Sequence, residues 1–293
     1  INNARDRVQW ISNYEPSPRL YLGQIARDKS FWGSSESDCE RSLQETNGTM
    51  NADVQGAVGI CALNAMLDGK TQLAAYLIAS GSFSDSLLGL QINADLFALT
   101  GNYEAAIESL GAAMTYFGSA SDLSAQRAAI DLHFGNLGGV KKYLEGSDYE
   151  KADTSLKYLV AGDYFFLEGD FSNSDLSYRR ALADGQTKIE ALTRLARLNR
   201  SYGNSLESES LLGEALQLDP TNYGARAQKA ELQLENSEYG NAIKTFEQLL
   251  SEKPDDLLIL NALAEAYLAE KLPQQALTSI QTAGLVEPSS AMP

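Results

Sequence analysis

The chain is poor in the residues that most often carry catalysis and metal binding. Its 293 residues include one histidine and two cysteines. A metal site built on His133 would need further ligands, so we expect this residue to lie at the surface or in a groove with no ligand role. The sequence has no Gly-x-x-x-x-Gly-Lys-Ser/Thr phosphate loop and no Gly-x-Ser-x-Gly nucleophile elbow. We therefore predict no catalytic residue, no metal and no cofactor in this chain.

Basic residues and long apolar runs are also scarce. The 23 Lys and Arg face 39 Asp and Glu, which gives a net charge of −16. Because phosphate contacts need Lys and Arg, this excess argues against nucleic acid as a partner, and equally against an anionic membrane surface. The sequence has no apolar run of the length that a membrane span needs. No signal peptide is visible, but residue 1 is isoleucine, so we expect a segment to precede it.

What the sequence does contain is a short repeat. Pro220, Pro254 and Pro288 are evenly spaced, and small and large apolar positions recur in the same register. Each copy has a small residue in a first amphipathic stretch, a turn that is often Gly-polar-aromatic, and a second apolar stretch. Apolar residues three and four apart indicate helices, and a fixed period of this length indicates copies of one small structural unit.

This pattern resembles the tetratricopeptide repeat, a helix-turn-helix unit of the same period. In residues 257–290 the resemblance is carried by Leu260, Leu263, Ala264, Tyr267, Ala276, Ile280, Ala283 and Pro288. The resemblance implies an all-α fold, a right-handed α-solenoid of about seven to eight helix pairs. Copy 121–154 matches least, since Gly138 and Gly139 open its second helix and Gly146 is expected to end that helix early.

The register also gives a division of the chain. We expect an N-terminal arm or cap over 1–17 and degenerate helix pairs over 18–86. Six repeats should then follow, at 87–120, 121–154, 155–188, 189–222, 223–256 and 257–290. The last repeat ends without a distinct polar capping helix, so the apolar face of residues 274–285 is expected to be poorly covered and able to mediate self-association.

In this family the first helix of each repeat lines a concave groove that takes extended peptides or helices. Leu132, Leu159 and Phe166 would then form an apolar floor beside Asp163. Arg194, Arg197 and Arg200 recur every three residues on the next first helix. Because arginine suits bidentate carboxylate recognition, we predict a groove site for a segment with an apolar anchor and a carboxylate. The alternative is that these arginines pair with Asp163, Glu190 or Glu231 and stabilise the array.

The two cysteines fall on helices that should pack together in this architecture. Cys39 lies on the expected second helix of one repeat and Cys61 on the first helix of the next. A disulfide between them would imply an oxidising compartment. Two buried, reduced cysteines are the alternative.

The sequence thus predicts a non-catalytic scaffold that binds a protein partner in its groove. The possible disulfide, the acidic surface and the expected preceding segment favour a bacterial periplasmic or outer-membrane-anchored factor. The resemblance to tetratricopeptide-repeat proteins of that kind implies a role in assembly of a pilus, secretion or polysaccharide-export complex. A cytoplasmic location is the alternative. A second class of function is the regulatory or substrate-binding portion of a larger enzyme whose catalytic domain lies outside this chain.

Overall fold

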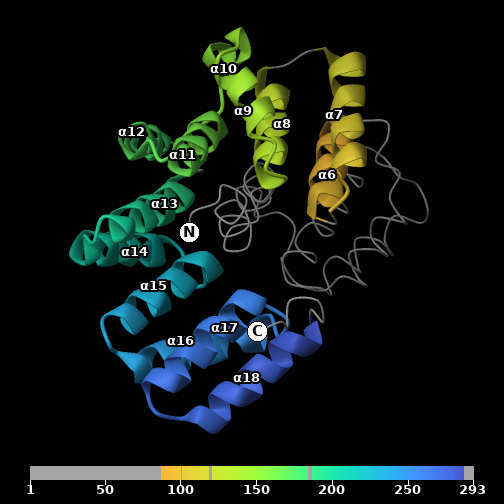
Figure 1. The fold of residues 1–293 in the computed structure, drawn as a ribbon. Coiled ribbons are helices and arrows are strands. Elements are labelled where there is room, and N and C mark those ends of the chain that lie inside the picture. Colours follow the sequence, from red (N-terminus) through yellow and green to blue (C-terminus); the bar gives the residue numbers. More distant parts are fainter. Residues whose placement is uncertain (1–86, 100, 119–120, 184–186, 287–293) are drawn as a thin grey trace, which may run out of the picture. The chain divides into compact units, whose positions relative to one another are not determined.

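The computed structural model describes residues 87–99, 101–118, 121–183 and 187–286 (Figure 1). Within these ranges there are thirteen helices and no strand, which confirms the all-α prediction. The predicted arm 1–17, the helix pairs of 18–86, and Cys39 and Cys61 lie outside the described residues. The chain divides into two compact units, Ile1–Ser177 and Tyr178–Pro293, with the boundary inside α12.

The helices follow one another in pairs. In the first unit they are α6 (Leu87–Leu99), α7 (Tyr103–Phe117), α8 (Ser121–His133), α9 (Leu137–Leu144), α10 (Ser147–Lys151), α11 (Leu156–Glu168) and the start of α12 (Phe171–Ala181). In the second they are α13 (Lys188–Ser201), α14 (Ser205–Leu218), α15 (Tyr223–Glu235), α16 (Tyr239–Glu252), α17 (Leu257–Ala269) and α18 (Pro273–Val286).

The second helix of every pair begins one full repeat length after the previous one. These helices start at residues 103, 137, 171, 205, 239 and 273. The same two-residue turn precedes each of them. The first residue of the turn has a positive φ: Gly101, Gly135, Gly169, Gly203, Ser237 and Lys271.

Each of these turns closes the first helix with the same pair of backbone hydrogen bonds. In the first turn, the amide of Gly101 donates to the Ala98 carbonyl at 3.1 Å and the amide of Asn102 to the Phe97 carbonyl at 2.8 Å. The other five turns repeat both bonds at the corresponding positions. This is the Schellman arrangement, which needs a left-handed residue and therefore favours glycine there.

The second residue of the turn then begins the next helix. Asn102, Asn136 and Asp170 each accept a hydrogen bond in their side chain from the amide three residues further on, at 3.2, 3.2 and 3.1 Å. An N-cap of this kind satisfies an amide that the helix itself leaves free. The Gly-Asn or Gly-Asp pair thus ends one helix and starts the next.

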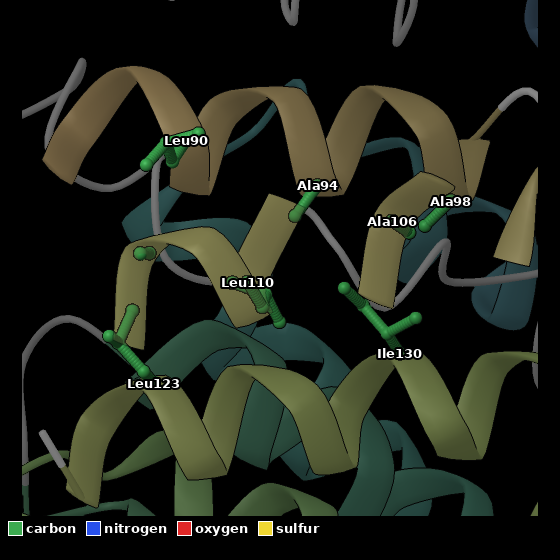
Figure 2. Packing of buried hydrophobic residues seen from close by; sticks show 8 residues of the cluster. Leu90, Ala94, Ala98, Ala106, Leu110, Leu123 and Ile130 are labelled. Atoms are coloured by element: carbon green, nitrogen blue, oxygen red, sulfur yellow. The ribbon is translucent and has the colours of Figure 1, made fainter. Parts of the chain in front are cut away.

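Small residues let the helices of the first unit approach closely. Ala94 and Ala98 of α6 face Ala106 and Leu110 of α7 in one buried cluster, and α8 completes it (Figure 2). The contribution of α8 is a pair of residues seven apart, Leu123 and Ile130. A seven-residue spacing places both side chains on one helix face.

The second unit repeats this packing with other residues. Its cluster joins Leu192 and Ala196 of α13, Leu212 and Ala215 of α14, and Ala225 and Leu232 of α15. Ala225 and Leu232 are again seven residues apart. In both clusters the first helix of one repeat therefore covers the second helix of the repeat before it.

Prolines fix where two of the second helices end. Pro220 and Pro254 stand two residues after the ends of α14 and α16. The residues before them have non-helical backbones, with φ −142° and ψ 95° at Asp219 and φ −136° and ψ 87° at Lys253. Proline disfavours the helical conformation in the residue that precedes it, which explains both ends.

The repeat 121–154 departs from the others, as its glycines predicted. Helix α9 has eight residues and ends at Leu144, just before Gly146. The five-residue helix α10 that follows was not predicted. The Ser124 hydroxyl of α8 donates to Asp148 of α10 (2.8 Å), and just after α10 the Asp153 amide donates to Asp122 of α8 (3.0 Å).

Candidate protein-binding surface

In the first unit a buried polar network joins the first helices α6 and α8. The Gln126 amide nitrogen donates to the Asp95 carboxylate at 2.9 Å and to the Gln91 carbonyl at 3.1 Å. The Gln91 side-chain amide donates to the Gln126 oxygen at 3.1 Å. All three side chains are buried, and the second oxygen of Asp95 has no hydrogen-bond partner. Desolvation raises the pKa of Asp95 to about 8, partly offset by the Gln126 hydrogen bond.

The three residues predicted to form the apolar floor of the groove, and Asp163 beside them, all lie in this unit. Leu132 is on α8, and Leu159, Asp163 and Phe166 are on α11, a helix that packs against α8. All four side chains are buried, and the Phe166 ring packs against Phe171 of α12 with centroids 5.5 Å apart. Their burial makes them part of the helix packing, and the binding role assigned to them stays a prediction.

The three predicted arginines lie on α13 in the second unit. Arg194 and Arg197 are 1% and 2% exposed. Arg194 donates to the Glu190 backbone carbonyl at 3.4 Å. Arg200 forms an ion pair with Glu231 of α15 and lies 3.7 Å from Glu235. Arg200 is therefore paired with acidic side chains of the next first helix, as the alternative interpretation expected.

In the second unit, other polar and apolar side chains of first helices lie on α15 and α17. These two helices contact each other. Leu234 and Leu268 occupy equivalent positions of consecutive repeats, as do Glu231 and Glu265. Glu265 is exposed, and Leu268 is 56% exposed. We call this surface the α15–α17 strip and define it by Glu231, Leu234, Glu235, Asn261, Glu265 and Leu268. Its charged groups are all acidic.

His133 is half-buried at the end of α8. Burial lowers the pKa of His133, and a hydrogen bond to the backbone of Ala98 partly offsets this shift. Its Nδ1 has no hydrogen-bond partner, and its ring stands edge-on to Phe134 with centroids 5.0 Å apart.

Among the residues that the structure describes, no group of three or more His, Cys, Asp or Glu side chains could hold a metal ion. No helix in the same ranges combines the length and apolar character needed to cross a membrane.

Residues 233–292 match the family model described as Tetratricopeptide repeat. The chain is 24% identical to "BBSome complex member BBS4" of Bos taurus over 285 residues, which is 92% of this chain and 51% of that protein. It is 29% identical to "Tetratricopeptide repeat protein 21A" of Mus musculus over 104 residues, 36% of this chain and 8% of the relative. The chain thus spans about half of one of these relatives and a small part of the other.

The fold also has counterparts among solved structures. A structure of IFIT1 with m7Gppp-AAAA has a TM-score of 0.63 and 14% identity, covering 93% of this chain and 75% of that one. At this identity the likeness concerns the fold. Together with the repeated turn and the constant spacing of the second helices, these comparisons confirm the predicted resemblance: the described part of the chain consists of helix pairs of the tetratricopeptide type.

Proposed function

We propose that this chain is a non-catalytic scaffold that binds a polypeptide segment of another protein along its first helices. The observation that carries the proposal is the α15–α17 strip, where acidic and apolar groups recur at the repeat interval on adjacent first helices, and where Glu265 and Leu268 are exposed. Repeat proteins use surfaces of this kind for extended contacts with other chains. Protein–protein interaction is also the coarse function that the fold suggests.

The charges of the strip indicate the chemistry of the partner. Glu231 and Glu235 already hold Arg200, and Glu265 is exposed one repeat further on. A segment with a basic side chain and an apolar anchor would complement Glu265 and the exposed Leu268. This differs from the carboxylate-bearing segment predicted from the arginines, because Arg194 and Arg197 are buried. A carboxylate contact at Arg200 would require displacement of its two acidic neighbours.

Peptide selection tests the proposal and needs no identified partner. A library of displayed random peptides would be selected on the intact chain and then assayed against two variants. The first variant, Glu265→Lys with Leu268→Ala, changes the strip. The matched control, Glu209→Lys with Leu206→Ala, makes the same changes at exposed positions of α14, a second helix.

Selected peptides should be rich in Lys or Arg with an apolar residue nearby. They should lose at least about tenfold in affinity for the strip variant, about 1.4 kcal/mol, and keep their affinity for the control. Peptides that bind both variants as well as the unmodified chain would contradict the strip as the binding surface.

The finer expectations made from the sequence remain proposals. A bacterial envelope assembly factor, in the periplasm or anchored to the outer membrane, gains no support from relatives in cattle and mouse. The regulatory portion of a larger enzyme is the second candidate class. A catalytic activity retained by the isolated chain would contradict both proposals.

A further inference from the structure

Helix α18 differs from the other helices in its charge. It carries no Asp, Glu, Lys or Arg, whereas each of the other helices in the described ranges has at least one. Pro273, Leu277, Ile280 and Gly284 follow one another at helical spacing on one side of it, which we call the α18 face. Leu277 and Ile280 are 50% and 49% exposed.

The repeat shows that the central position of this face, Ile280, is covered elsewhere. Tyr178, Leu212 and Phe246 hold the position of Ile280 in the three preceding repeats and are 0%, 1% and 0% exposed. In the second unit the next first helix packs on such a face, α15 on α14 and α17 on α16. The Ile280 position is therefore an inter-repeat contact position that, in the described ranges, remains half exposed on α18.

We propose that the α18 face is a contact between two copies of this chain, with α18 of one copy packed against α18 of the other. The charge argument selects a second copy as the occupant. Two molecules that each carry a charge of −16 repel, and a face without charges is where they meet with least like-charge contact. A twofold contact uses the same patch on both sides, so an uncharged patch opposes an uncharged patch.

The shape of the face suits such a pairing. In an antiparallel pair centred near Ile280, Leu277 lies opposite Gly284 of the partner subunit, a large side chain over a residue with no side chain. Small residues of this kind allow helices to approach closely. One helix from each copy buries less than the roughly 1,200–2,000 Å² of a standard interface. We therefore expect a weak, concentration-dependent dimer.

Analytical ultracentrifugation of the full chain over a range from about 1 μM to 1 mM tests this, a span chosen around the micromolar affinities of weak complexes. The unmodified chain should shift from monomer towards dimer as the concentration rises. Ile280→Glu places two carboxylates across the twofold axis and should weaken association by at least about tenfold. Leu206→Glu makes the same change at a residue of α14 that is 85% exposed and should leave association unchanged.

Mixing two variants distinguishes this pairing from any other contact of α18. Ile280→Glu and Ile280→Lys should each stay monomeric alone and associate when mixed, because opposite charges then face each other across the axis. Leu277→Glu provides a second variant, which should also stay monomeric alone. Circular dichroism checks that it keeps its helix content. A monomeric unmodified chain at the highest concentration would overturn the proposal. So would variants whose mixture fails to associate, since that outcome assigns the α18 face to a different surface or to another protein.

Discussion

Ser237 and Lys271 hold the same left-handed backbone conformation, with φ of 64° at each, at equivalent positions of consecutive repeats. Four glycines hold this position in the earlier repeats, with φ between 73° and 82°. The turn needs the left-handed conformation for its two closing hydrogen bonds, and an L-residue adopts it at a cost of about 1–2 kcal/mol. The last two turns are therefore strained where the first four are not.

Replacing the strained residues by glycine should stabilise the second unit. We expect Ser237→Gly and Lys271→Gly each to raise the free energy of unfolding by about 0.5–1 kcal/mol, the relief of strain less the extra entropy of the unfolded chain. The reverse change, Gly203→Ala, has open space around the added methyl group and should lower stability through φ alone. Urea denaturation measures all three. A loss of stability in both glycine variants would refute the strain argument.

The two adjacent glycines of α9 should respond in opposite ways to alanine. A Cβ at Gly139 would stand 2.5 Å from an oxygen of Asp131, whereas at Gly138 its nearest neighbour would be 3.8 Å away. Asp131 cannot easily move, because it accepts hydrogen bonds from the Tyr103 hydroxyl (2.6 Å) and from Asn136 (2.8 Å).

Gly139→Ala should therefore destabilise the first unit by about 1–3 kcal/mol. Gly138→Ala should be neutral or stabilising by up to about 1 kcal/mol, because alanine is the better helix former. Thermal denaturation followed by circular dichroism distinguishes them. Equal effects of the two substitutions would show that the close approach of α8 and α9 has no energetic weight.

The buried carboxyl of Asp95 should make stability depend on pH. Its pKa is raised from 3.8 to about 8 in the folded chain, so between these values the folded state keeps a proton that the unfolded state releases. Stability should then fall as the pH rises from about 4 to about 8 and level off above that range. Below the unfolded value both states are protonated, and the group contributes no pH dependence.

Asp95→Asn should remove this dependence while keeping an oxygen that accepts from Gln126. The free energy of unfolding of Asp95→Asn, relative to that of the unmodified chain, should be higher at pH 8 than at pH 5. Urea denaturation at each pH measures this difference. The control, Glu108→Gln, alters an exposed carboxyl of α7 in the same unit and should change the pH profile little. A stability gap that is the same at both pH values would contradict the raised pKa.

The ion pairs of Arg200 should be unequal in strength. Its partner Glu231 has a side chain 14% exposed, whereas the side chain of Glu235 is 53% exposed and lies 3.7 Å away. Arg200→Ala leaves the shielded Glu231 without this partner and should cost about 1–3 kcal/mol. Glu235→Ala should cost less than about 0.5 kcal/mol, since solvent screens that contact. Similar losses in the two variants, measured by denaturation, would count against this ranking.

Much of the helical architecture could be predicted because its signals are local. Gly101-Asn102 and Gly169-Asp170 specify a turn through the conformation of the glycine and the cap of the following side chain, both within a few residues. Pro220 and Pro254 mark helix ends for an equally local reason. Helix α10 was missed because its anchors are contacts with α8, more than twenty residues away, which no short-range pattern reveals.

The period, the helix pairs and the place of each turn follow from the amino-acid sequence, since backbone preferences and side-chain spacing act along the chain. Which side chains of the predicted groove stay open depended on the tertiary structure. Arg194 and Arg197 have the spacing of groove residues, yet both are buried, while Leu268 is half exposed. Burial depends on what packs against a helix face from elsewhere in the chain, and helical periodicity specifies the face without specifying its neighbour.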